Sequence, residues 1–521
     1  MVGVVSVPEK TLKKLNERIL PQWKICFLSA LAVGIIAHLY KITNWLPNWD
    51  SLVFRYDSQN MLALGRWLLP VVCLPSSFYD LPFLNGIIAI LFHALGAVCI
   101  CKILNVKKKM TAFLIGAVIV SFPTVTSVMM YNYVADGYSV AFFLSALATV
   151  LMTKEKPRYI LSAILIALSS GIYQAYITVT IVLVMLFLID ETIYKKETLV
   201  VILKKGLLIF LSGVLGVALY AIILKVLLCV SSSRLIDYQG ISTAASFFGI
   251  DVWGSLYAIK KTFIKCFFDI SKGLNLYIVI NIFVFLFTLA HYVKYIIKNG
   301  IYKNPSKIFV LVIMGFMLVS GAGALAFMNP GLDYHNLMLM GYVVFYLFFL
   351  VLYERGKDTN EKHLLAKCWT VFIIALMIIL NQVVISNVSY HKAQIAYEKS
   401  YGVLIRIADR IETTYKTESC DRVLVVGALR NSEPYSVNLT PDITGITDGY
   451  IIRADDETVG QSVLCSALND YCGKNYKFIS GERKKELLAK NSIASMESWP
   501  GKGCVLVEGN VVIVKLGAES E

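Results

Sequence analysis

Residues 206–230 read GLLIFLSGVLGVALYAIILKVLLCV, a run of 25 residues in which Lys225 is the only charged side chain. A helix of roughly 17–25 apolar residues is long enough to cross the hydrocarbon core of a bilayer. The whole chain of 521 residues shares this character, because 57% of its residues are hydrophobic and only 16% are charged. That composition is far from the composition of an ordinary soluble domain. We therefore predict a polytopic α-helical membrane protein.

Apolar runs of similar length recur along the first three quarters of the chain. They lie near residues 25–42, 82–104, 111–130, 137–153, 158–172, 174–190, 206–230, 274–295, 308–328, 335–353 and 367–388. The boundary between the fifth and sixth runs stays open, because Ser169-Ser170-Gly171 interrupts one long apolar stretch as either a kink or a turn. The pattern predicts about eleven transmembrane helices.

Basic residues cluster at the ends of these runs. The clusters lie within residues 10–24, 107–109, 154–158, 195–205, 294–307 and 355–367. With eleven spans, all six clusters fall on one side, which the excess of Lys and Arg in cytoplasmic loops identifies as the cytoplasm. The first run is too long for a signal peptide and lacks a small-residue cleavage site, so we expect an uncleaved span with a cytoplasmic N-terminus.

The net charge of +14 is explained by these orienting clusters and gives no indication of nucleic-acid binding. An odd number of spans places everything after residue 388 outside the cytoplasm. We therefore predict a transmembrane domain over residues 1–388 and an extracytoplasmic α/β domain over residues 389–521. A helical pattern over 395–416, a strand from Arg422 to Gly427 and a hairpin within 501–516 indicate about four strands.

Four of the eleven cysteines lie in this C-terminal part: Cys420, Cys465, Cys472 and Cys504. An even set in an oxidising compartment predicts up to two disulfides. The alternative is four reduced cysteines in a core, because a free cysteine packs as a small apolar residue.

The first outward loop carries the strongest functional signal. It contains Asn48-Trp49-Asp50, Arg55-Tyr56-Asp57 and Gly65-Arg66-Trp67. Ionisable groups held at a membrane surface are costly, and among aromatic residues they often mark chemistry or a ligand. The alternative is an interfacial stretch anchored by Trp45, Trp49 and Trp67, with its charges in water.

Two further features lie on the same predicted side. Residues 129–138 place Asp136 among three tyrosines, including Tyr138, at the start of an apolar run. Asp136 is also suited to be the N-cap of that helix, and both roles are compatible. In Gly171-Ile172-Tyr173-Gln174 an amide side chain enters an apolar run, where it needs a hydrogen-bond partner from another helix or from a substrate.

The order of these features resembles the bacterial glucosyl transferase II membrane proteins, within the C-type glycosyltransferase (GT-C) superfamily. The resemblance rests on the loop from Asp50 to Trp67, on Tyr131–Tyr138 with Asp136, on Gly171–Gln174, and on the helix leading into the Val-Leu-Val-Val-Gly427 strand. It covers most of the chain in topology, although each motif is short.

The resemblance implies a membrane glycosyltransferase that takes a sugar, glucose by the family name, from a polyprenyl-phosphate donor. The acceptor would be a cell-surface glycan at the outer face of the bacterial cytoplasmic membrane. It further implies that a first-loop carboxylate, Asp50 or Asp57, acts as general base on the acceptor hydroxyl, with Asp136 as a third candidate. Partial desolvation beside Trp49 and Tyr56 would raise the pKa of that carboxylate and its basicity.

The leaving phosphate gains negative charge and needs a fixed cation nearby. Arg66 is the leading candidate, because a guanidinium binds phosphate oxygens at two points. The alternative for Arg66 is a side chain that snorkels to water from the following apolar segment. The other candidate substrate contacts are Arg55, Arg234, His335, Trp49, Tyr56, Tyr138, Tyr173 and Gln174.

No cofactor is expected. Asp50, Asp57 and Asp136 would hold a divalent cation only if their loops converge, and the sequence lacks His-rich or EF-hand spacing, so we predict no obligatory metal. Trp253, Tyr257, Lys260, Lys261 and Lys265 predict a helix on the anionic membrane surface, which would also help to seat the donor phosphate.

The predicted partners are the lipid-linked donor, the glycan acceptor, membrane lipid and, in the cell, a donor synthase and a flippase. The rival functions are a surface polysaccharide polymerase and a lipid-linked glycan flippase. A transporter is disfavoured, because transporters typically carry deep charges and repeated halves.

Overall fold

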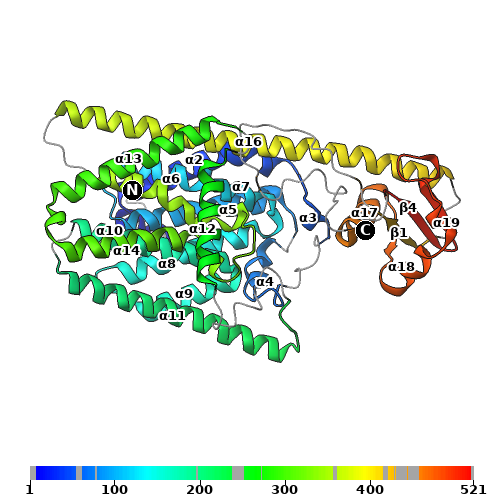
Figure 1. Cartoon of the computed structure of the whole chain (residues 1–521), viewed down its shortest axis with the longest axis horizontal. Coiled ribbons are helices and arrows are strands. Elements are labelled where there is room, and N and C mark those ends of the chain that lie inside the picture. Colours follow the sequence, from blue (N-terminus) through cyan, green and yellow to red (C-terminus); the bar gives the residue numbers. More distant parts are fainter. Residues whose placement is uncertain are drawn as a thin grey trace, which may run out of the picture.

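The structure is a computed structural model of the whole chain, drawn in Figure 1. It describes residues 7–53, 61–76, 79–194, 197–236, 251–270, 273–355, 361–414, 420–427, 429, 443 and 457–517. A bundle of long helices forms one part of the molecule, and the longest helix runs along this bundle and beyond it to a small α/β region (Figure 1).

Helices account for the whole bundle. They are α1 (Val7–Arg18), α2 (Pro21–Thr43), α3 (Trp49–Val53), α4 (Leu69–Val72), α5 (Pro82–Ile103), α6 (Lys109–Ser121), α7 (Pro123–Met130), α8 (Ala135–Thr153), α9 (Tyr159–Ile172), α10 (Ile177–Tyr194), α11 (Leu199–Val230), α12 (Val252–Phe268), α13 (Leu276–Lys298), α14 (Pro305–Ala322), α15 (Val344–Glu354) and α16 (Glu361–Thr414).

Every predicted apolar run contains a helix, which agrees with a polytopic α-helical fold whose helices could span a membrane. In the described residues, eight helices are long and apolar enough to cross a membrane, or nine if the bent pair α6 and α7 is one span. The two helices are inclined by 41° because Pro123 disfavours helical geometry at Phe122. The helices α9 and α15 are shorter, so the count of eleven spans remains a prediction.

The open boundary between the fifth and sixth runs is a turn. Ser169, Ser170 and Gly171 remain inside α9, and the chain becomes extended at Tyr173, with φ −155° and ψ 115°. Ser169 Oγ donates to Ala141 O at 2.8 Å, which is one of the hydrogen bonds that join α9 to α8. Two separate helices therefore follow one another here.

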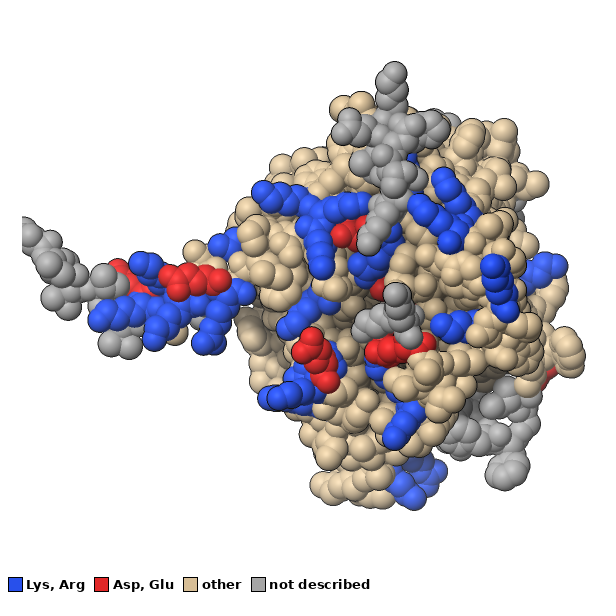
Figure 2. Space-filling view, turned by 90° about the vertical axis from the view of Figure 1, so that its left-hand side faces the viewer, with Lys and Arg blue, Asp and Glu red and all other residues tan. Residues whose placement is uncertain are grey.

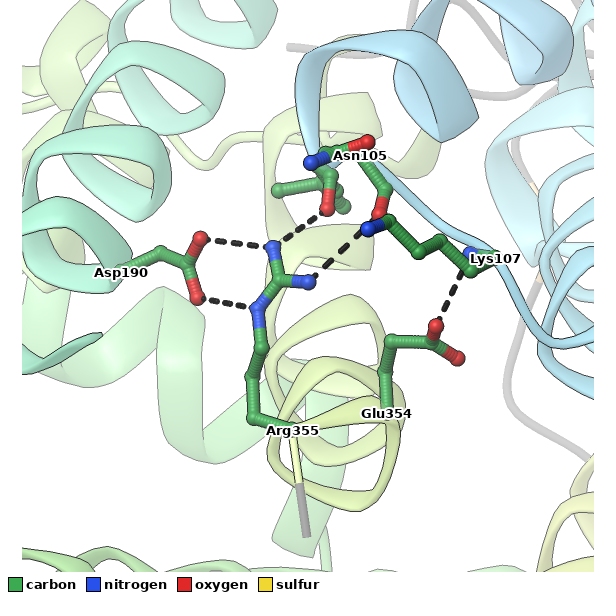
Figure 3. Close-up of polar contacts among 6 residues, drawn as sticks. Asn105, Lys107, Asp190, Glu354 and Arg355 are labelled. Carbon is green, nitrogen blue, oxygen red and sulfur yellow. Dashed lines mark hydrogen bonds and ion pairs between the residues drawn. The ribbon is translucent and has the colours of Figure 1, made fainter. Parts of the chain in front are cut away.

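One end of the bundle carries the basic residues. Figure 2 shows this end, opposite the α/β region, with many Lys and Arg side chains and few acidic ones. Arg355 binds Asp190 through Nε at 2.9 Å and Nη2 at 2.8 Å, and its Nη2 also donates to Leu104 O at 2.6 Å. Figure 3 shows how this contact joins the ends of α5, α10 and α15.

Glu354 completes the junction at the basic end. Its Oε1 accepts from Lys107 N at 2.8 Å (Figure 3). The same Oε1 accepts from Lys108 N at 3.1 Å, and Oε2 accepts from Thr111 Oγ1 at 2.6 Å. A carboxylate at the start of α6 satisfies free amides and complements the helix dipole. The ends of α5, α6, α10 and α15 thus meet at the basic end of the bundle. This agrees with the prediction that the basic clusters lie on one side.

The C-terminal region contains the strands β1 (Arg422–Val426), β2 (Lys477–Phe478), β3 (Val505–Glu508) and β4 (Val511–Lys515), with α17 (Glu457–Cys472), α18 (Gly481–Leu488) and α19 (Asn491–Ala494). The sheet order is β2-β1-β4-β3, with β1 parallel to both neighbours and β3–β4 a hairpin. The predicted first strand, hairpin and strand number are confirmed. The predicted boundary at 388/389 falls within α16, which continues unbroken to Thr414.

The predicted surface helix is present as α12, and Figure 1 shows it crossing the long helices at a steep angle. Asp251 caps it, because Asp251 Oδ1 accepts from Gly254 N at 2.8 Å. Trp253, Tyr257, Lys260 and Lys261 are exposed. The predicted aromatic and basic face is therefore open, and its contact with lipid remains a prediction.

The disulfide expectation is wrong. All eleven cysteines of the chain are free thiols. In the C-terminal region Cys465 and Cys504 are buried, and Cys465 Sγ lies 3.5 Å from Tyr476 O. These residues follow the alternative of reduced cysteines packed in a core.

Alkylation with mass spectrometry tests this. At neutral pH we expect Cys420 and Cys472, which are partly exposed, to react before Cys465 and Cys504. Burial raises the pKa of Cys465 to about 11, so its reactive thiolate is scarce at neutral pH and its labelling should speed up as the pH rises. After denaturation without reductant all four should react, whereas labelling that requires a reductant would reveal disulfides.

Candidate functional site

The turn at Gly65 sets the geometry of the first loop. Gly65 has a φ of +74°, and a Cβ on it would lie 2.6 Å from Tyr220 Oη and 2.7 Å from Gln174 Nε2. Gln174 Nε2 donates to Leu64 O at 2.9 Å, and Tyr220 Oη donates to Gly65 O at 3.0 Å. The Gln174 amide thus finds its hydrogen-bond partners within the protein and holds the loop in place. This agrees with the alternative in which its partner comes from the protein and not from a substrate.

The next residues of the loop pack against the end of α9. Leu68 N donates to Gly171 O at 2.8 Å. A Cβ on Gly171 would lie 2.5 Å from Trp67 Cε2, so only a glycine admits the indole here. Trp67, which is half-buried, therefore packs against the end of α9.

Arg66 points into a cluster with two tyrosines, which we call the Arg66 cluster (Arg66, Tyr138 and Tyr173). Arg66 is 8% exposed, and its Nη1 donates to Tyr138 Oη at 3.0 Å. The guanidinium carbon lies 5.0 Å from the Tyr173 ring centre. The two tyrosine rings stack at 4.4 Å with an interplanar angle of 16°. The snorkelling alternative for Arg66 is wrong, because the guanidinium is buried in a cation–π arrangement.

Asp136 lies beside the Arg66 cluster, at the start of α8. It is 2% exposed, and its Oδ1 accepts from Gly137 N at 2.9 Å and from Cys73 Sγ at 3.6 Å. Ser76 is a further hydrogen-bond partner. The N-cap interpretation is wrong, because the cap position belongs to Val134, but a carboxylate in the first turn still complements the helix dipole.

Charge effects connect Asp50 and His335 with Arg66. Asp50 is partly exposed on α3, and its charge acts on the Tyr133 phenol together with the charge of Arg66. Arg66 also acts on the His335 ring, whose other charged neighbours are Asp333 and Lys265. Lys265 Nζ binds Asp333 at 2.7 Å, which brings α12 to the edge of the site.

Other predicted residues are not brought into the cluster or lie outside the described residues. Arg234 is exposed, although Ile236 N donates to Ala63 O at 3.0 Å and places this segment beside the first loop. Those outside the described residues are Arg55, Tyr56, Asp57 and the side chain of Trp49. Within the described part of the chain, no three acidic, histidine or cysteine side chains are grouped to hold a metal ion.

Sequence reasoning missed a buried charged pair next to the site. Lys41 is fully buried at the end of α2, and it is attracted by Asp80. Asp80 Oδ1 accepts from Asn132 Nδ2 at 2.7 Å, just before Tyr133. Asn85 Nδ2 donates to Asn132 O at 2.8 Å. The sequence did contain a signal for this pair. Lys41 lies in the last turn of a predicted span, and Asp80 directly precedes Leu81-Pro82.

These elements place a buried cation and stacked tyrosines in a bundle of helices that are long and apolar enough to cross a membrane. The family described as Glucosyl transferase GtrII matches residues 39–352, more than half of the chain. The chain therefore belongs to the glucosyl transferase GtrII family, which confirms the predicted resemblance. No curated protein and no solved structure matches the chain.

The match spans every predicted site residue, from Trp49 to His335, and ends before α16. It supports a membrane glycosyltransferase. The individual roles of the site residues remain predictions.

Replacement of Gly65 by alanine tests the turn. Gly300 is a matched control, because its φ is +63° and no atom lies within 4 Å of a Cβ built there. Gly300→Ala should cost about 1–2 kcal/mol through left-handed strain alone. Gly65→Ala should cost about 1–3 kcal/mol more, because the methyl group collides with Tyr220 and Gln174. Thermal unfolding in detergent measures both, and equal losses would contradict the role of these contacts.

Proposed function

We propose that this protein transfers a sugar, glucose by its family, from a polyprenyl-phosphate donor to a cell-surface glycan. The observation that carries the proposal is the buried Arg66 cluster, with Asp50 and Asp136 beside it, in a chain of the glucosyl transferase GtrII family. Such a site offers a cation for a phosphate, aromatic faces for a sugar and carboxylates for a hydroxyl.

The reaction balances with these groups alone. The acceptor oxygen forms a bond to the anomeric carbon, and the bond from that carbon to the phosphate oxygen breaks. A carboxylate takes the proton of the acceptor hydroxyl, and the lipid phosphate leaves with one more negative charge. A direct displacement of this kind inverts the anomeric centre.

Arg66 would stabilise the charge on the leaving phosphate. Its guanidinium is already oriented by the Tyr138 hydroxyl and the Tyr173 ring, so little reorganisation is required when charge develops. Because the side chain is buried, its attraction for a phosphate is screened less than in water. His335 and the Lys265–Asp333 pair would extend the polar edge toward α12.

Asp50 is the better candidate for the base among the described aspartates. Asp136 is fully buried and engaged by Gly137 and Cys73, so it would position the loop against α8. Asp50 is partly exposed, and a general base must come within hydrogen-bond reach of the acceptor hydroxyl. Asp57 remains a candidate from the sequence.

The orientation follows from the charges. Basic clusters mark the cytoplasmic side, which would place the Arg66 cluster and the C-terminal α/β domain outside the cytoplasm, in the bacterial inner membrane. A donor synthase and a flippase would supply the lipid-linked sugar there. We expect GT-C-like catalysis without an obligatory metal. The alternative functions are a surface polysaccharide polymerase and a lipid-linked glycan flippase.

Transfer from a panel of radiolabelled polyprenyl-phosphate sugars tests the donor and the base. Membranes carry the wild type, Asp50→Asn, Asp57→Asn or Asp136→Asn at matched expression. We expect one donor, the glucose form, to be consumed, and Asp50→Asn to lower the rate about 10²–10⁴-fold, because general base catalysis is lost. If no donor is consumed, or all variants match the wild type, the transferase proposal fails and polymerase or flippase assays become decisive.

Arg66 is tested in the same assay with two replacements. Arg66→Ala should lower kcat about 10²–10³-fold, as expected for removal of a group that stabilises transition-state charge. Arg66→Lys should retain an intermediate rate, because it keeps the charge but loses the planar, two-point geometry. The control is Arg158→Ala, which is exposed at the basic end and should match the wild type. Unchanged kcat in Arg66→Ala would exclude a phosphate role.

A further inference from the structure

The short helix that carries Asp50 is held by the C-terminal region. Leu52 of α3 is 3% exposed and shares one hydrophobic core with Leu404 of α16 and with Val463 and Leu468 of α17. A helix of five residues is too short to be stable by itself in water. The position of α3, and with it the position of Asp50, therefore depends on tertiary contacts with α16 and α17.

Aromatic contacts fix the entrance to α3 in the same way. The Trp45 ring lies 6.3 Å from the Tyr397 ring of α16 and 5.8 Å from the Tyr471 ring of α17. Tyr401 stacks with Tyr397 at 6.2 Å and meets Tyr471 at 5.9 Å. Trp45, which is half-buried, is therefore held by two rings of the C-terminal region. Such aromatic pairs stabilise the contact beyond the area that they bury.

The helix α16 is itself locked to the membrane bundle. Tyr390 Oη lies 2.7 Å from His38 Nδ1, Gln382 Oε1 accepts from Ser121 Oγ at 2.8 Å, and Ser386 Oγ lies 2.7 Å from Thr126 Oγ1. These side-chain bonds set the axial register of α16 against α2, α6 and α7, because sliding would leave polar groups unpaired in an apolar layer.

At its other end α16 contacts the loop that precedes β3. Arg410 Nη1 donates to Gly501 O at 2.6 Å and to Pro500 O at 2.9 Å. Figure 1 shows α16 running from the bundle to the α/β region without a break. Contacts therefore connect the bundle to α16 and α16 to the α/β region. Both α16 and the α/β region in turn contact α3, which belongs to the first loop.

We propose that the C-terminal α/β region is a positioning element for the reaction: through α16 and α17 it holds α3, and with it Asp50, in its place in the first loop. This role rests on the proposed transferase function. Trp45 and Tyr471 are positioning residues in this scheme and make no contact with substrate. Loosening them lets the Asp50 carboxylate drift from the acceptor hydroxyl while the Arg66 cluster still binds the donor phosphate.

Kinetics of the full-length protein in membranes test the proposal. Trp45→Ala and Tyr471→Ala should each lower kcat about tenfold, with the donor KM within twofold of the wild type. Tyr471→Phe keeps the ring and should restore the rate. The double variant should be no slower than the slower single one, because both residues act in one contact. Arg483→Ala, in an exposed pair with Glu486 on α18, is the control and should match the wild type.

A second measurement separates positioning from general damage. In an Asp50→Asn background, Trp45→Ala should lower the residual rate no further, since the group that it positions is already gone. An equal tenfold loss in that background, or wild-type kinetics in both alanine variants, would overturn the positioning role. A wild-type protein that consumes no donor would instead overturn the proposed function and this role with it.

Discussion

The site depends on one contact, the packing of the turn at Gly65-Arg66-Trp67 against the turn at Gly171–Gln174. Irregular backbone at the end of a membrane bundle is tolerated only where its polar groups find partners within the protein. Here the partners are specific: Leu68 N bonds to Gly171 O, and Leu64 O accepts from Gln174. Gly65 and Gly171 make this close approach possible. Gly65 has a positive φ, and at both positions a methyl group would collide with neighbouring side chains.

The packing of these two turns also determines where the Arg66 guanidinium lies. Once Trp67 is seated on Gly171, the intervening Arg66 is directed at Tyr138 and Tyr173. Burial of a cation is costly unless the surroundings compensate it. At the basic end, Asp190 neutralises Arg355 in a two-point ion pair that joins helix ends. At the site, aromatic faces and a phenol hydroxyl orient the Arg66 guanidinium.

The sequence predicts the helices well and the contacts between them poorly. Apolar runs mark helices because the bilayer permits no other local solution, and the strands near Arg422 and Val511 follow from their β-branched residues. The grouping of Gly65, Asp136 and Gln174 was predictable only through the order of motifs in the family. Periodicity contains no information on which distant turns touch. For the same reason Asp80 and Lys41 were missed, since their burial arises from tertiary packing at the ends of predicted spans.

Trp45, Trp67 and Arg66 are residue types that often lie at a lipid–water boundary, yet here each also packs against protein elements from elsewhere in the chain. Trp45 is covered by α16 and α17, which lie beyond the segment that matches the family. The matched segment therefore contains the charged and aromatic groups of the site, whereas the helix that presents Asp50 is supported from outside it. In the proposed function, the reacting groups and the elements that position them thus belong to different parts of one chain, which the unbroken helix α16 joins.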